Sequence, residues 1–169
     1  MLEAYLEALE EGYFEVKFAF EGLADENVWK RPAEGLLSVG ELAGHIAYWE
    51  SMRFAGDGGN NAADRVKFQV KSVLLDHHFR YYPSTLAASP TNELLAMTAE
   101  QVYSELLRVH NESLAYFKAL NPDLDGVPPG QPEYFTYRAC LKYAAFHIAY
   151  HTGQMFTARH LLGEETPDN

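Results

Sequence analysis

The stretch SVGELAGHIAYWESMR, residues 38–53, predicts an amphipathic helix and is the clearest indication of the fold. The Ser38 side chain can cap the first turn, while Glu41, three residues later, can reach back and complete a capping box. The stretch has no two-residue alternation typical of a strand. Its apolar residues instead recur at intervals of three and four, the period of one helix face: Leu42, Ile46, Trp49 and Met52.

Three further stretches on either side of this one predict long helices. Residues 2–23 carry apolar side chains at the same helical spacing. Residues 98–120 begin with a second capping box, formed by Thr98 and Gln101. Residues 136–162 follow a proline-rich loop and carry the fourth such pattern, which ends at Gly163 ahead of a charged tail. Four long helices without a strand pattern predict an all-α protein, and specifically a four-helix bundle.

The lengths of the connections predict the order of these helices. About 45 residues separate the second helix from the third, with a short helix expected near residues 62–75. A crossover of that length allows the second and third helices to run parallel, which gives up-down-down-up order. The length of the chain favours a single domain over residues 1–169.

The composition excludes several classes of protein. The chain has 24 acidic and 13 basic side chains, a formal charge of −11, which argues against general affinity for nucleic acid or anionic lipid. No apolar run approaches the roughly 20 residues of a membrane helix, and the acidic N-terminus does not resemble a signal peptide. The single cysteine, Cys140, excludes an internal disulfide and a Cys-rich zinc module. We expect a cytoplasmic protein whose partner is a small molecule rather than nucleic acid or membrane.

The charge is unevenly distributed along the chain. Residues 1–26 carry eight acids against Lys17 alone, a net charge of −7, whereas residues 53–80 carry five bases against three acids, a net charge of +2. The simplest interpretation is a solvated acidic helix face and a basic loop. The alternative is that the basic stretch helps to recruit an anionic small molecule.

Three histidines form a candidate metal site. His147 and His151 are four residues apart on the last predicted helix, a spacing that lets both imidazoles reach one cation. His45 lies on the second helix, where it either bonds a hydroxyl or carbonyl in the core or faces the pair across the bundle. Gln154 and Glu41 are candidates to orient the imidazoles, although capping is the simpler role for Glu41.

The other histidines are weaker candidates. His77 and His78 are adjacent and are expected in a loop, while His110 is expected to be exposed in mid-helix. His160 lies near a helix C-terminus, which favours a cation.

Two further features lie close to the histidine pair in the sequence. Cys140 precedes His147 by about 10.5 Å of helix axis, which indicates a buried structural thiol rather than a ligand. Glycine within a helix costs about 1 kcal/mol relative to alanine, so Gly44 and Gly153 predict close helix–helix approach.

Two segments resemble the DinB-like (DinB/YfiT-like) metalloenzymes, which are unrelated to the DNA polymerase sharing the name. The first, GLADENVWKRPAEGLLSVGELAGHIAYWE (22–50), has a tryptophan and a proline ahead of a capped helix with one histidine. The second, YAAFHIAYHTGQMFTARHLLG (143–163), has His-x-x-x-His, then Gly-Gln, an arginine and a terminal Leu-Leu-Gly. Chain length and helix order agree as well, whereas residues 53–97 match no pattern of the family.

The resemblance implies a fold, a metal and an activity. Its metal ligands fall on His45, His147 and His151, and the metal is divalent, most often zinc or nickel. It also implies an up-down-down-up four-helix bundle and a homodimer. Some members transfer a low-molecular-weight thiol such as bacillithiol or mycothiol, or act as thiol-dependent isomerases.

Four hypotheses follow for the function. Three neutral imidazoles leave a divalent cation coordinatively open, so it can hold a thiol as its thiolate or lower the pKa of a water. The first property favours a metal-dependent transferase with a small thiol co-substrate, and the second favours a metal-dependent hydrolase. The alternatives are a non-catalytic metal-binding bundle and a helical interaction domain without metal. No catalytic residue beyond the histidines is identified.

Overall fold

The computed structural model describes residues 2–57, 66–80 and 90–167, and four long helices dominate it. The long helices are α1 (Leu2–Phe20), α3 (Val39–Ala55), α5 (Ala99–Leu120) and α6 (Tyr137–Leu161). Shorter helical segments connect them: α2 (Asp25–Val28), α4 (Asn92–Leu95), and the 3₁₀ turns η1 (Val73–Leu75) and η2 (His77–Arg80). Within the described ranges the β-structure is an isolated bridge between Gly56 and Phe68. The all-α prediction is confirmed.

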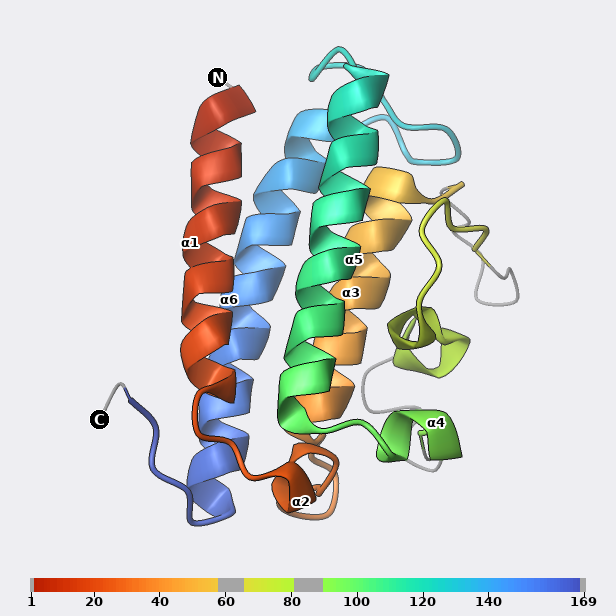
Figure 1. Cartoon of the computed structure of the whole chain (residues 1–169). Coiled ribbons are helices and arrows are strands. Elements are labelled where there is room, and N and C mark those ends of the chain that lie inside the picture. The colour runs from red at the N-terminus through yellow and green to blue at the C-terminus, as the bar shows by residue number, and fades with distance from the viewer. Residues whose placement is uncertain (1, 58–65, 81–89, 168–169) are drawn as a thin grey trace.

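The long helices lie side by side in two closely packed pairs (Figure 1). One pair is α1 with α6, the other is α3 with α5, and α3 also packs against α6. In Figure 1, α1 and α6 run from the top of the view to the bottom, whereas α3 and α5 run from the bottom to the top. The segments η1 and η2 cover α3 on its remaining side.

Helix α3 is the centre of this arrangement. Every residue of α3 is buried except Trp49 and Arg53. The helix begins as predicted, because Ser38 accepts from the Glu41 amide and the Glu41 side chain accepts from the Ser38 amide. A helix covered on all sides places any polar side chain it carries among other buried groups, which then need partners.

The segment that follows α3 is not the helix expected near residues 62–75. Residues 62–65 lie outside the described ranges, and between Val66 and Leu75 only η1 is helical. The backbone amide of Gln69 donates to the Ala55 carbonyl at 2.8 Å, which holds this stretch extended against the end of α3. Four of its apolar residues are buried, as helical spacing suggested, but they reach the core without an α-helix: Val66, Val70, Leu74 and Leu75.

Helix α1 ends at Phe20, three residues before the predicted end, and α6 holds that end in place. Gly22 adopts a positive φ of 72° just after α1. The Arg159 side chain, 1% exposed, donates through Nη1 to the carbonyls of Phe18, Ala19 and Glu21. The guanidinium therefore satisfies carbonyls that a helix C-terminus leaves without partners.

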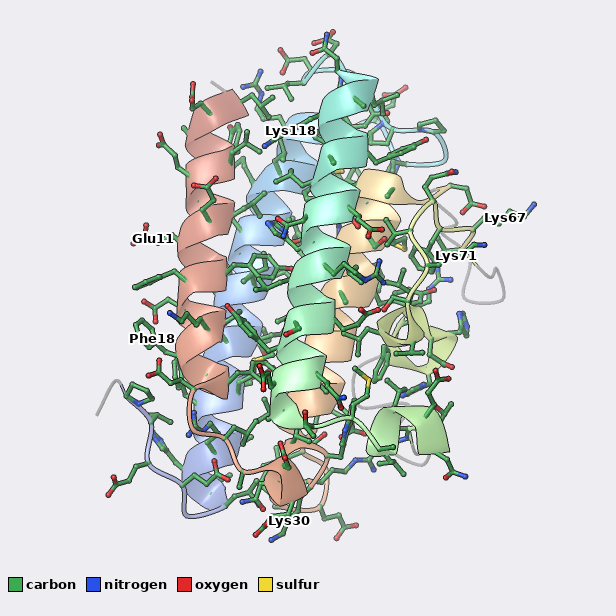
Figure 2. All side chains as sticks on the ribbon, viewed as in Figure 1. Glu11, Phe18, Lys30, Lys67, Lys71 and Lys118 are labelled. Carbon is green, nitrogen blue, oxygen red and sulfur yellow. The ribbon has the colours of Figure 1, made fainter. Side chains whose placement is uncertain are left out.

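Several charged side chains point outward from the long helices, in contrast to the buried Glu41, Glu50 and Arg159. Glu11, Lys67, Lys71 and Lys118 all extend away from the helices in Figure 2, and all are exposed. Among the described residues, no helix is both long and apolar enough to cross a membrane.

Candidate metal centre

The three candidate histidines meet between α3 and α6. His45 comes from α3, while His147 and His151 come from successive turns of α6. The Nε2 atoms of His147 and His151 lie 3.1 Å apart, and the His45 ring centroid lies 5.1 and 4.7 Å from theirs. One ligand nitrogen from each ring lies within 4.8 Å of the other two, and no ring is more than 6% exposed. The structure therefore brings together the set that the sequence and the resemblance indicated.

Two of the imidazoles are held through Nδ1. His45 Nδ1–H donates to the Phe79 carbonyl at 2.7 Å, and His151 Nδ1–H donates to Gln154 Oε1 at 2.6 Å. Since an oxygen of a carbonyl or amide only accepts, the proton is on Nδ1 and Nε2 carries a lone pair. This is how proteins commonly orient histidines that bind a metal. The His151 partner was predicted, whereas the His45 partner was one of two alternatives left open.

Burial keeps the three imidazoles neutral. The pKa of His45 falls to about 4 and that of His147 to about 2, mainly because burial disfavours the charged ring and secondarily because His151 lies close by. The pKa of His151 is also lowered by burial, which outweighs the opposing effect of the bond to Gln154. The neutral imidazole is the form that binds a metal, so protons do not compete for these nitrogens at neutral pH.

The spacing of the nitrogens suits one small cation. Metal–nitrogen distances of 2.0–2.1 Å in a tetrahedral site separate neighbouring nitrogens by about 3.3 Å. The 3.1 Å between His147 and His151 already agrees with this value. With all ligand nitrogens within 4.8 Å of one another, His45 needs to approach by at most about 1.5 Å. A donor set of three imidazoles suits a divalent transition metal such as zinc, copper, iron or nickel.

The segment η2 supports the site from the side, a role that sequence reasoning missed. Its Phe79 carbonyl accepts from His45, and its Arg80 carbonyl accepts from Trp49 Nε1 at 2.8 Å. Gly44 makes this approach possible, because a Cβ atom there would lie 2.6 Å from three carbons of the Phe79 ring. The glycine was expected to admit a neighbouring long helix, but it admits the 3₁₀ turn η2.

A cavity of about 430 Å³ opens beside the histidines. It is lined by the three histidines, by two arginines and by four aromatic side chains: Arg53, Arg80, Trp49, Tyr143, Phe146 and Tyr150. Among these described lining residues there is no carboxylate. The cavity therefore combines potential metal ligands, positive charge and an apolar wall.

Comparison with known protein families identifies the family of this chain. The sequence profile of the DinB superfamily matches residues 8–155. The chain belongs to the DinB superfamily. The matched region contains the three histidines and every described residue that lines the cavity. No curated protein and no solved structure matches the chain.

The remaining histidines of this DinB-superfamily chain lie apart from the centre, and one was misjudged. His110 was expected to be exposed but is buried: its Nδ1 bonds Glu50 Oε1 at 2.6 Å, and its ring packs on Tyr13 with centroids 3.9 Å apart. Burial and the nearby Glu50 raise the pKa of Tyr13, whose hydroxyl donates to Glu50 Oε2. The exposed prediction was wrong because His110 faces α1 and α3 rather than solvent. His160 is exposed.

His77 and His78 lie in η2 rather than in a loop without regular structure. His78 Nδ1 bonds Asp76 at 2.7 Å, and His77 Nδ1 lies 3.3 Å from the Tyr48 hydroxyl. Neither belongs to the cluster of ligand nitrogens.

The positions of three further residues test the roles predicted for them: Cys140, Glu41 and Gly153. Cys140 is buried, outside the histidine cluster, and burial raises its pKa to about 11, which agrees with a structural thiol. Glu41 caps α3 and bonds Arg31 rather than orienting His45. The prediction for Gly153 was wrong, because no atom lies within 4 Å of a Cβ built there.

Proposed function

We propose that this DinB-superfamily protein binds a divalent metal, zinc or nickel, through His45, His147 and His151, and acts as a metal-dependent transferase on a low-molecular-weight thiol. The observation that carries the metal site is the anchoring of His45 and His151 through Nδ1, which turns their Nε2 lone pairs toward His147. Family membership supports the same ligands. The cavity beside the site is large enough for a small substrate.

The lining of the cavity favours thiol chemistry over hydrolysis. A divalent cation in this position favours the deprotonated form of a thiol or of a water. In the zinc metalloproteases a glutamate is the general base that activates the metal-bound water, and no carboxylate is present among the described lining residues. The protein's own thiol, Cys140, is buried elsewhere, so the reacting thiol has to come from a substrate.

A catalytic role fits the number of ligands better than a purely structural one. Structural zinc sites are closed by four protein ligands, whereas catalytic sites use three and keep one position open. The cluster in the described part of the chain consists of three histidines. The cavity lies on the same side as these histidines, where an open position is accessible.

The proposal includes the family's up-down-down-up four-helix bundle and its homodimer. The directions of α1, α3, α5 and α6 in Figure 1 support the helix order. Light scattering on the purified protein tests the dimer.

Bound metal is the first test. The protein is purified without a His-tag or added metal, and its metal content is measured by elemental analysis for wild type, His147→Ala and the control His160→Ala. Wild type and the control are expected to hold near-stoichiometric metal, since His160 is an exposed residue of the same helix. Near-stoichiometric metal in folded His147→Ala would refute the site.

Activity is the second test. Metal-loaded protein is incubated with bacillithiol, mycothiol or glutathione and an electrophile, and loss of the free thiol is followed. We expect consumption that depends on both metal and His147. If metal binds but no thiol reacts faster than in the protein-free mixture, the transferase proposal fails and the non-catalytic alternative stands.

A further inference from the structure

Two arginines give the cavity a positive charge that the metal proposal does not use. Arg53 comes from the last turn of α3, and Arg80 ends η2. Both line the cavity with the histidines. The other described bases of the mildly basic stretch, Lys67 and Lys71, point outward into solvent (Figure 2). The positive charge of this stretch is therefore divided between the cavity and the surface.

Arg53 is held in place by aromatic rings rather than by an acid. Its guanidinium carbon lies 4.4 Å from the Tyr143 ring centroid and 4.8 Å from that of Trp49. Its Nη1 donates to the Trp49 carbonyl at 2.9 Å, while its buried Nε has no hydrogen-bond partner. Within the described residues no carboxylate pairs with Arg53, and the nearby Glu50 is bound to His110 and Tyr13. Burial lowers the pKa of Arg53 to about 10, so it remains charged at neutral pH.

An aromatic ledge borders the same cavity. Tyr143, Phe146 and Tyr150 follow one another on the face of α6 that carries His147 and His151. The rings of Phe146 and Tyr150 are stacked with centroids 6.0 Å apart, and they are 62% and 53% exposed. A flat apolar group placed on this ledge would lie next to the histidines and to Arg53.

We propose that the cavity selects a small carboxylate with a flat apolar body, whose carboxylate pairs with Arg53 and whose body lies on the Phe146–Tyr150 ledge. The planar guanidinium matches a carboxylate, and rings against its face leave edge N–H groups as donors. Arg80 lines the same cavity and adds a second positive charge. This deepens the proposed function by naming a substrate class for the same site, and the metal is not required for the pairing.

The test uses two probes of nearly equal size and shape. Binding of benzoate and of the neutral benzamide is measured by calorimetry and Trp49 fluorescence, with protein stripped of metal by a chelator. We expect wild type to prefer benzoate and the preference to weaken as salt is raised. Equal binding of the two probes by wild type overturns the proposal, and that result needs no variant.

Variants test whether Arg53 and the Phe146–Tyr150 ledge contribute to binding of the probes. Arg53→Gln is expected to weaken benzoate binding roughly 10- to 100-fold and to leave benzamide unchanged. Phe146→Ala is expected to weaken both probes to a similar extent. Arg138→Gln is the control for Arg53→Gln, because Arg138, at the start of α6, pairs with Asp125 and does not line the cavity. Circular dichroism checks folding, and Arg53→Lys, which keeps the charge, replaces Arg53→Gln if the latter does not fold. The lysine variant is expected to keep a preference for benzoate.

The outcomes separate this proposal from the metal proposal. Benzoate preference in stripped protein that fails to bind metal supports the carboxylate site and refutes the metal site. Metal binding without a preference for benzoate supports the metal site and refutes the carboxylate site. Unchanged benzoate binding in folded Arg53→Gln overturns the assignment of Arg53.

Discussion

Replacing Gly44 with alanine tests how the 3₁₀ turn η2 supports the histidine centre. The added Cβ would lie 2.6 Å from Cδ2, Cε2 and Cζ of the Phe79 ring. Ordinary carbon contacts are about 3.5–4.0 Å, so the ring has to retreat by roughly 1 Å. Phe79 is 3% exposed, and overpacking of a core in this way typically costs about 1–3 kcal/mol. The gain from removing a helical glycine is about 1 kcal/mol, so a net loss of up to about 2 kcal/mol is expected.

Gly153→Ala is the matched control on α6. Nothing lies within 4 Å of a Cβ at this position, and the residue is exposed, so only the gain in helix propensity remains. That gain is up to about 1 kcal/mol. The two variants should therefore differ in stability by about 1–3 kcal/mol, which corresponds to about 1 M in the urea midpoint for a typical small protein.

The Gly44→Ala substitution should also weaken metal binding. Displacement of Phe79 moves the carbonyl that accepts from His45 Nδ1 at 2.7 Å. Loss of such an orienting partner typically lowers metal affinity by about 10- to 100-fold. Zinc affinity is measured by competition with a chromogenic chelator for wild type, Gly44→Ala and Gly153→Ala. The reasoning is refuted if both alanine variants match in urea midpoint and in zinc affinity.

Three other predictions concern buried groups. His110→Ala should cost about 3 kcal/mol or more in urea unfolding, because it removes the 2.6 Å partner of buried Glu50, while metal content stays unchanged. Cys140 should react with a thiol reagent at pH 8 only after denaturation, because the thiol is buried and its pKa is raised to about 11. In metal-free protein the folded pKa values of His45 and His147 lie below the ordinary 6.5, so acid protonates the unfolded chain first and stability falls as the pH drops through 6.5. Protonation of each residue should lower the free energy of unfolding by about 2 kcal/mol between pH 7 and 5. Urea unfolding at several pH values should therefore show a shallower decline in stability for His147→Gln than for wild type.

The long helices were predictable because their signals are local. The capping residues Ser38 and Thr98 mark the starts of α3 and α5 as predicted, since the bonds they form span only three residues. The failure near residues 62–75 has a physical cause. Helical spacing of buried residues also arises when an extended segment is held by a neighbour, as the bond from Gln69 to Ala55 shows.

The candidate centre was predictable only in part. The spacing of His147 and His151 indicates a shared face on one helix, but the approach of His45 depends on packing between helices, so the sequence pattern left it as one of two alternatives and the family resemblance favoured it. The burial of His110 could not be predicted, because its partner Glu50 is on another helix, 60 residues earlier in the chain. In the structure Glu50 is itself buried, and a buried acid requires a partner such as His110.

The residues around the histidine centre come from two kinds of backbone, the long helices and the connection that contains η2. The three candidate ligands are on the regular helices α3 and α6, whose positions are determined by the core. Arg80 and the Phe79 carbonyl come from η2, in a connection where no helical pattern constrains the sequence. A backbone carbonyl is supplied by any residue, so side chains in this connection can change without removing the His45 partner. Of the proposed substrate contacts, Arg80 can therefore vary while the histidine geometry is retained, whereas Arg53 and the Phe146–Tyr150 ledge are on the same helices as the histidines.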